Sequence, residues 1–521
     1  MAADLYERAP REAKAVEEML KARVAPAAII TGGEVNGIEN VLLNGSIGEI
    51  STLYRSRRLS VAEAVSWYLA RVERFRHLNA VREISGHALH EAKLADDALA
   101  KGADLGPLHG IPVLLKDNIF VSGMKACAGA RALAQFEPSR DASVVTRLRA
   151  AGCIVLGKTN MTEFADYVSD VMPSEFSGAG GVVTNPHGIR YDRGQGSSVG
   201  SAACVAASLA PIAIGTETQN SIQTPACYSS VVGYKPSTGR VSRAGVVPLV
   251  PSQDSPGPLT RCVADAALVG ARLAGADPRD SCTLTYAQHA APDASKVVDL
   301  KGLRIGVPRR QIAARAEFDG VMPLFESALS RLSSAGASIV DPCDLPSAEQ
   351  LQEVRSSVFR TEFKAALNTL LEDCNGPGGM NSLADIIAWN DRHPDAMPYG
   401  QPLLIAAQET NGLSDRTYRA DRARDITLSI DAGIAAALSM HDVDVLVAPM
   451  GAAAKCTGKA GAPVLAVPAS KHSSGTPFGI TFFCKSGDDA MLLAIGVAVE
   501  RVLDGRQLPT SVDVAKEVNH D

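Results

Sequence analysis

The sequence predicts an α/β protein with a large, mixed, mainly parallel twisted sheet covered by helices on both faces. Short apolar runs typical of buried strands stand at 153–156, 209–214, 303–308 and 443–449. Amphipathic helix patterns alternate with these runs, and strands separated by helices usually pair in parallel. With 521 residues, the chain is long enough to bury an extensive core.

The first 47 residues are predicted to lie outside the main body. Residues 1–20 have a charged helix pattern, and the Gly/Asn-rich passage 31–46 indicates a loop. Residues 48–510 are expected to form a single catalytic domain, followed by a C-terminal tail at 511–521.

Capping residues predict where two of the helices begin and end. Ser60 and Glu63 have the spacing of a capping box, which predicts that a helix over 60–75 begins there. A second helix is expected to start at Asp141 and to stop at Gly152, directly before the first apolar strand.

Residues 345–430 have a different pattern, in which turn residues separate several short helix-like segments. We expect this region to be an inserted helical cap over the sheet.

Composition and charge exclude several classes of function. The net charge is −6 and the pI is about 6.0, so no basic excess favours nucleic acid or an anionic membrane. No apolar run approaches the roughly 20 residues of a membrane span, and the charged N-terminus does not resemble a signal peptide. The ten cysteines are scattered without a CxxC pair. This pattern predicts reduced thiols in a cytoplasmic protein and gives no metal-binding framework.

Two motif matches lack the context that their chemistry needs. Residues 152–159 (GCIVLGKT) match a P-loop formula, but their middle residues are themselves a predicted strand where a phosphate cradle needs a loop. Residues 196–200 (GSSVG) match a nucleophile elbow, but polar residues precede them instead of a strand. A Ser-His-Asp triad is not favoured either, because the downstream histidines lie in unpatterned polar segments: His289, His393 and His441.

Three other segments carry residue types suited to acyl transfer. Lys116 ends an apolar run, the Gly/Ser-rich loop 194–198 enters a helix of small residues, and Ser221 lies in the polar turn 215–226. Taken singly, each has an ordinary interpretation: a surface lysine, a tightly packed helix and a polar turn.

Taken together, these segments resemble the amidase signature family. The sequences GIPVLLKDN (110–118), GSSVGSA (196–202) and GTETQNSIQTPA (215–226) are similar to its active-site blocks, and 24 residues separate Ser197 from Ser221, as in the family. The resemblance covers roughly residues 48–500 and is greatest to the branch that contains bacterial peptide amidases. It implies the amidase-signature fold and a reaction without metal or cofactor.

The resemblance also implies a Ser-cisSer-Lys triad. Ser221 would be the nucleophile, Lys116 the general base, and Ser197, after a cis peptide bond, the serine that passes protons between them. Such a triad is chemically reasonable, because serine needs a base to become nucleophilic and burial can lower the pKa of a lysine by several units. The family's oxyanion donors are backbone N–H groups, here those of Thr218, Gln219, Asn220 and Ser221.

The chain departs from the family near the nucleophile. Most relatives have glycine where Gln219 and Asn220 stand, and if the turn needs a positive φ at 220, asparagine is the least costly replacement. Gln219 is expected to enter the substrate pocket and to influence specificity. Gln223 replaces an arginine found in relatives with acidic or tRNA-linked substrates, which argues against a carboxylate anchor. Gln223 itself is expected to contact substrate, and Ser198 and Cys127 are further candidates for such contact.

The leading hypothesis is a serine-dependent amidohydrolase that cleaves a carboxylic amide C–N bond of a neutral, partly apolar small molecule or peptide. The pocket walls are expected to come from the cap and from loops near 127–130 and 444–460. One alternative is an amidotransferase subunit that delivers ammonia to a tRNA-bound partner, and another is a catalytically silent relative. A homodimer is left open, and neither nucleic acid nor membrane is expected as a direct partner.

Overall fold

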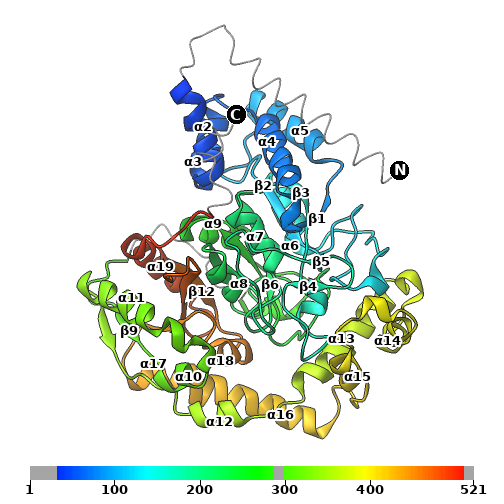
Figure 1. Ribbon diagram of the computed structural model, residues 1–521, viewed down its shortest axis with the longest axis vertical. Helices are drawn as coiled ribbons and strands as arrows, with labels where there is room; N and C mark the ends of the chain where they lie inside the picture. The colour runs from blue at the N-terminus through cyan, green and yellow to red at the C-terminus, as the bar shows by residue number, and fades with distance from the viewer. Residues whose placement is uncertain (1–31, 287–297, 510–521) are drawn as a thin grey trace.

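One large sheet runs through the centre of the molecule (Figure 1). The computed structural model describes residues 32–286 and 298–509, and this sheet has 11 strands. In spatial order, the strands are β1 (Val81–Ile84), β3 (Ile154–Thr159), β2 (Pro112–Lys116), β6 (Ile212–Glu217), β8 (Ser255–Thr260), β7 (Val232–Lys235), β12 (Val464–Lys471), β13 (Pro477–Phe483), β11 (Val445–Pro449), β9 (Arg304–Gly306) and β10 (Ser338–Val340).

The sheet is mixed, as predicted, but it is not mainly parallel: four of its described strand pairs are parallel and six are antiparallel. β2 pairs in parallel with β3 and β6, and β9 pairs in parallel with β10 and β11. The pairs that lead from β6 to β11 are antiparallel, as is the pair of β1 with β3. The carboxyl ends of parallel strands meet at one edge of a sheet. Lys116 and Glu217, the last residues of β2 and β6, are therefore brought to the same edge.

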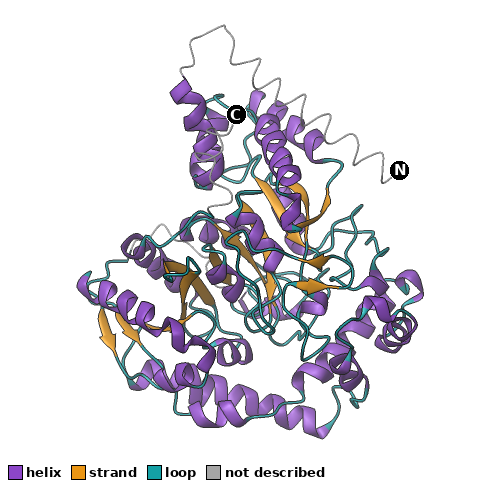
Figure 2. Cartoon of the chain, in the orientation of Figure 1, coloured by secondary structure: helices purple, strands orange, loops and turns teal. Residues whose placement is uncertain are grey.

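Helices surround the sheet (Figure 2). Those outside the predicted cap are α4 (Val61–Arg74), α5 (Ala88–Ala100), α6 (Ser143–Ala150), α7 (Val199–Ala206), α8 (Gln223–Tyr228), α9 (Val263–Leu273), α10 (Arg309–Ala313), α11 (Met322–Ser334), α17 (Ala435–Met440), α18 (Ala454–Lys459) and α19 (Asp489–Leu503). None of the helices within residues 32–286 and 298–509 is long and apolar enough to cross a membrane.

The first predicted helix start is confirmed and the second is wrong by two residues. At α4, the Ser60 hydroxyl accepts from the Glu63 N–H and the Glu63 carboxylate accepts from the Ser60 N–H, at 3.1 and 2.9 Å. α6 begins at Ser143, without a side-chain cap. Asp141 does not cap it, because its carboxylate accepts the backbone N–H of Ser122 at 2.8 Å.

The P-loop match lies in a strand. β3 continues through Gly157 and Lys158, so no loop is present to cradle a phosphate. The Lys158 ammonium is buried and donates to three carbonyl oxygens, those of Asp117, Ile119 and Lys125.

Five α-helices lie in residues 345–430, and Figure 1 shows them at the end of the molecule opposite α2 (Gly32–Asn44) and α3 (Ile47–Arg55). They are α12 (Ala348–Glu353), α13 (Val358–Asp373), α14 (Leu383–Arg392), α15 (Pro402–Gln408) and α16 (Arg416–Ile426), and a π-helical stretch, Thr427–Ile434, follows them.

The loop expected at 31–46 is mostly helix. Residues Gly32–Asn44 form α2, and α3 (Ile47–Arg55) follows directly. Tertiary contacts override the weak helix propensity of this passage. The carbonyl oxygen of Leu42, near the end of α2, accepts from the Tyr68 hydroxyl at 2.8 Å and from the Arg261 guanidinium at 2.7 Å. The helix predicted at 1–20 and the tail at 511–521 lie outside the described residues.

Candidate active site

Lys116 is fully buried at the end of β2. Its Nζ donates to the Ser197 hydroxyl at 2.7 Å, and to the hydroxyl and carbonyl oxygens of Thr216 at 2.9 and 3.1 Å. The lysine is therefore held between the serine loop and the end of β6, and it is not a surface lysine.

Burial changes the acid–base behaviour of Lys116. Removal from water lowers the pKa of its ammonium to about 7, although the negative charges of Asp254, Glu217 and Asp166 act in the opposite direction. A large fraction of the molecules then carry a neutral Lys116 near pH 7, as a general base requires.

Ser197 lies in the loop that leads into α7 and is fully buried. The predicted cis peptide bond before it is wrong, because Asp341–Pro342 is the one cis bond among the described residues. The chain turns here at Gly196, which has a φ of 94°, a conformation open to glycine.

Ser221 lies in the turn between β6 and α8, and its exposed fraction is 4%. Its carbonyl oxygen accepts the backbone N–H of Ser198 at 3.0 Å. Gly196 also fits closely against this turn, since an added Cβ would lie 2.7 Å from the carbonyl oxygen of Asn220. The fold thus brings all three predicted segments together. Lys116 donates a hydrogen bond to Ser197, and the backbone N–H of Ser198 donates one to the carbonyl oxygen of Ser221.

The backbone of this turn presents free donors. Within the described part of the chain, the N–H groups of residues 219–221 donate no hydrogen bond. The following N–H groups, of Ile222 and Gln223, both donate to the Glu217 carboxylate, at 2.6 and 2.8 Å. Glu217 therefore fixes the end of the turn and leaves the preceding N–H groups available for a ligand.

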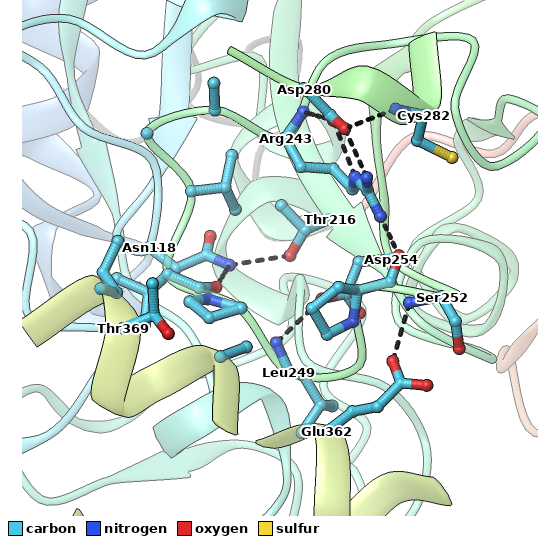
Figure 3. A pocket seen from close by; sticks show the side chains of 18 of the residues that line it. Asn118, Thr216, Arg243, Leu249, Ser252, Asp254, Asp280, Cys282, Glu362 and Thr369 are labelled. Carbon is cyan, nitrogen blue, oxygen red and sulfur yellow. Dashed lines mark hydrogen bonds and ion pairs between the residues drawn. The ribbon is translucent and has the colours of Figure 1, made fainter. Parts of the chain in front are cut away.

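A cavity of about 780 Å³ adjoins these residues. Asn118, Thr216 and Thr218 line it, and Figure 3 shows the Asn118 amide donating to the Thr216 hydroxyl, at 3.0 Å. Because this hydroxyl also accepts from Lys116, the cavity wall is in direct contact with the buried base.

The opposite walls of the cavity come from residues 243–256 and from α13 and α16 of the 345–430 region. Arg243 is paired with Asp280, and the Glu362 carboxylate accepts the Ser252 N–H at 2.9 Å (Figure 3). Four arginines and four carboxylates line the cavity, so its formal charge is balanced.

Comparison with known proteins identifies the family. The family model described as Amidase matches residues 63–459, most of the chain. The chain belongs to the amidase family. A probable amidase of Arabidopsis thaliana is 32% identical to it over 481 residues, which are 89% of this chain and 91% of that protein.

Solved structures confirm the predicted amidase-signature fold. The peptide amidase from Stenotrophomonas maltophilia has a TM-score of 0.83 and 37% identity, with coverage of 89% of this chain and 98% of that one. An amidase family protein from Bacillus anthracis also has a TM-score of 0.83, with 30% identity and coverage of 96% and 98%. Among curated proteins, a glutamyl-tRNA(Gln) amidotransferase subunit from Burkholderia thailandensis is 41% identical over 316 residues, 58% of this chain and 62% of that protein.

The two side chains that distinguish this amidase at the turn do not enter the cavity. Neither Gln219 nor Asn220 has a positive φ, so the turn does not require glycine at either position. The Gln219 side-chain amide donates to the Gln253 side-chain oxygen at 3.2 Å. A Cβ added at Gly458 would lie 2.5 Å from Gln219 Cγ, so this glycine leaves room for the Gln219 side chain. The Asn220 amide donates to the carbonyl oxygen of Gly194. Ser221 does not line this cavity either, so the substrate role of Gln219 stays a prediction.

Gln223 also faces inward in this amidase. Its side-chain amide is buried and donates to Glu217 at 2.6 Å and to the carbonyl oxygen of Gln219 at 2.7 Å. Gln223 therefore braces the turn, and the prediction that it contacts substrate was wrong.

Ser198 and Cys127, two further predicted contact residues, lie outside the cavity lining. The Ser198 hydroxyl donates to the carbonyl oxygen of Thr216 at 3.2 Å, and the Cys127 thiol donates to the Asp117 carboxylate at 3.0 Å. The loops 127–130 and 444–460, expected as pocket walls, contribute no lining residue either. Long-range packing turns these side chains toward the protein interior.

Several residues of the site were not predicted. Asn118 and Glu217 lie inside the sequence blocks that carry the family resemblance. Their positions near Lys116 and Ser221 in the sequence could therefore have indicated that they belong to the site. Asp254 accepts from the Thr218 hydroxyl at 2.5 Å, but it is far from this turn in the sequence and only the fold brings it there.

Within residues 32–286 and 298–509, no histidine is hydrogen-bonded to Ser197 or Ser221 as a serine triad would require. His393 is bonded and stacked to Trp389 of α14, and His441 follows α17, while His289 lies outside the described residues. In the described ranges, no group of three or more His, Cys, Asp or Glu side chains is arranged to hold a metal ion.

Proposed function

We propose that this amidase hydrolyses a carboxylic amide C–N bond through an acyl-Ser221 intermediate, with Lys116 as general base and Ser197 as proton relay. The observation that carries the proposal is the buried Lys116, whose pKa is about 7 and whose Nζ lies 2.7 Å from the Ser197 hydroxyl. A lysine of this kind can accept a proton at neutral pH, which a surface lysine cannot do.

Acylation begins with proton transfer. Neutral Lys116 accepts the hydroxyl proton of Ser197 while Ser197 accepts that of Ser221, and the Ser221 oxygen attacks the amide carbonyl carbon. The N–H groups of residues 219–221 stabilise the oxyanion, since they have no other acceptor. When the C–N bond breaks, Ser197 gives its proton to the leaving nitrogen and recovers one from Lys116. The amine leaves neutral and the acyl group stays on Ser221.

Deacylation repeats these transfers with water. Water gives a proton to Lys116 by way of Ser197, and its oxygen attacks the acyl carbon. The Ser221 oxygen then leaves, takes back a proton through Ser197 and releases the carboxylic acid. Each half-reaction returns Lys116 to its neutral form.

The cavity supports a neutral, partly apolar substrate. Its arginines and carboxylates are equal in number, and Val247, Leu249 and Ala366 contribute apolar surface. The similarity to a peptide amidase structure favours a peptide C-terminal amide among the neutral substrates.

Replacement of the nucleophile tests the proposal. S221A should lose amide hydrolysis by at least about 10⁴-fold, measured as ammonia or amine release from a panel of primary amides, secondary amides and anilides. Its thermal unfolding midpoint should match that of the wild type. Full activity in S221A would contradict the proposal.

The similarity to the amidotransferase subunit favours a second candidate, glutamine hydrolysis with ammonia delivered to a partner. Glutamine in the same panel tests it: selective ammonia release from glutamine would favour this candidate. A fluorophosphonate probe tests the catalytically silent alternative, because labelling at Ser221 requires an activated hydroxyl.

A further inference from the structure

Asp166 is a half-buried acid near the site, and the proposed mechanism does not use it. Its Oδ2 accepts from the Ser174 hydroxyl at 2.8 Å and from the Gly194 N–H at 3.1 Å. Its Oδ1 is buried and has no hydrogen-bond partner in the described part of the chain. A carboxylate oxygen left in this state costs free energy, so Asp166 is placed at some expense to stability.

The backbone that carries Asp166 is strained. Phe164, Ala165 and Asp166 have φ values of 44°, 56° and 74°, in the left-handed region that non-glycine residues seldom adopt. Contacts on both sides hold this conformation: the Phe164 N–H donates to the carbonyl oxygen of Ala128 at 2.9 Å, and its ring packs 5.6 Å from that of Phe363 in α13. Backbone strain that packing maintains is concentrated at functional sites.

Asp166 is connected to the serine loop and to the Ser221 turn through one residue. Gly194, whose N–H binds the Asp166 carboxylate, stands three positions before Ser197. Its carbonyl oxygen accepts from the side chain of Asn220, the neighbour of Ser221. Asp166 therefore fixes the segment that joins the relay serine to the nucleophile.

We propose that Asp166 is a positioning residue for the amide hydrolysis: its side chain holds Gly194 in place for Ser197 and Asn220. This inference rests on the proposed function.

The charges around both groups give the sign of the effect. The negative charges of Asp254, Glu217 and Asp166 raise the pKa of Lys116 against the larger effect of burial. Burial raises the pKa of Asp166 to about 7, while Arg193 and Lys116 oppose this rise. Near pH 7 Asp166 is therefore about half ionised, so removal of its partial charge lowers the pKa of Lys116 slightly and moves the acid limb of the activity profile a little to lower pH.

Two substitutions separate charge from position. D166N removes the charge but keeps an oxygen that can accept from Gly194, whereas D166A removes both. D170N is the matched control, because Asp170 is an exposed acid in the same segment, paired with Arg193. The measurement is the rate at which a fluorophosphonate probe labels Ser221 between pH 5 and pH 9, with thermal unfolding of each variant.

The wild type is expected to react faster as pH rises, and D166N should shift the midpoint down by up to about half a pH unit, because Asp166 is about half ionised where Lys116 titrates. D166A should react at least about 10-fold more slowly at pH 8, and D170N should follow the wild type. If D166N superimposes on the wild type, or D166A reacts at the wild-type rate, the role of Asp166 is overturned while the proposed function stands. A wild type that is never labelled at Ser221 overturns both. If D166A fails to fold, the D166N profile decides alone.

Discussion

The side-chain amide of Gln223 donates a 2.6 Å hydrogen bond to the carboxylate of Glu217, and both side chains are buried. Glu217 ends β6 and also accepts the N–H groups of Ile222 and Gln223, so the pair joins the strand to the first turn of α8. The intervening residues, which include Ser221, are therefore closed into a loop of fixed shape.

Q223M should damage catalysis more than binding. The substitution leaves one Glu217 oxygen and the carbonyl oxygen of Gln219 without their donor, so the N–H groups of residues 219–221 lose their fixed direction. We expect kcat to fall roughly 10- to 100-fold with a small change in KM, and the free energy of unfolding to fall by about 1–3 kcal/mol. Q135M, at an exposed glutamine, is the control. If Q223M keeps the wild-type kcat, the Gln223–Glu217 pair does not determine the direction of the N–H groups of residues 219–221.

The pH dependence of turnover should report Lys116. Because the base must be neutral and its pKa is lowered to about 7, kcat/KM should rise with pH through an apparent pKa near that value. The measurement is kcat/KM for a neutral amide from pH 5 to pH 9. A profile that is flat across this range would argue against Lys116 as the base.

K116M should change stability in a pH-dependent way. The pKa of Lys116 is lower in the folded state than in the unfolded state, so between pH 7 and pH 10 the unfolded wild type binds more protons and its stability rises with pH. Methionine does not titrate, so this contribution is absent from the variant. The stability of K116M relative to wild type should therefore fall by about 2 kcal/mol from pH 7 to pH 9, measured by urea unfolding. A constant difference would contradict the lowered pKa.

The sequence predicted which three segments the fold brings together better than it predicted the side chains around them. Lys116, Ser197 and Ser221 stand at strand ends and in a glycine-rich loop, where the local pattern determines position. The direction of the Gln219 side chain depends on Gln253 and Gly458, which are distant in the sequence, so the local pattern could not reveal it. The helix α2 was missed for the same reason, since its contacts with Tyr68 and Arg261 outweigh its weak local propensity.

Two glycines in the serine loop provide a matched pair of substitutions. Gly194 and Gly196 both have positive φ, but a Cβ at 194 meets nothing within 4 Å, whereas a Cβ at 196 would lie 2.6 Å from Pro225 and 2.7 Å from the carbonyl oxygen of Asn220. Both alanine variants carry the backbone strain, and only G196A adds the clash with the Ser221 turn. We expect G196A to lose at least about 100-fold in kcat and G194A to lose far less, both compared at equal folded fraction. Equal losses of kcat in G196A and G194A would show that the close contact between Gly196 and the Ser221 turn is not needed for catalysis.

The cap should influence which substrates enter. Ala366 of α13 lines the cavity, so the indole of A366W would occupy volume that a substrate needs. We expect kcat/KM for a bulky anilide to fall at least 10-fold, since overfilling a packed space is costly, while labelling of Ser221 by a small fluorophosphonate stays within about threefold of wild type because the triad is untouched. E372W, at an exposed position of the same helix outside the cavity lining, controls for helix effects. If anilide hydrolysis and Ser221 labelling slow by the same factor in A366W, the substitution disturbs the triad. If kcat/KM for the anilide does not fall, the anilide binds outside this cavity.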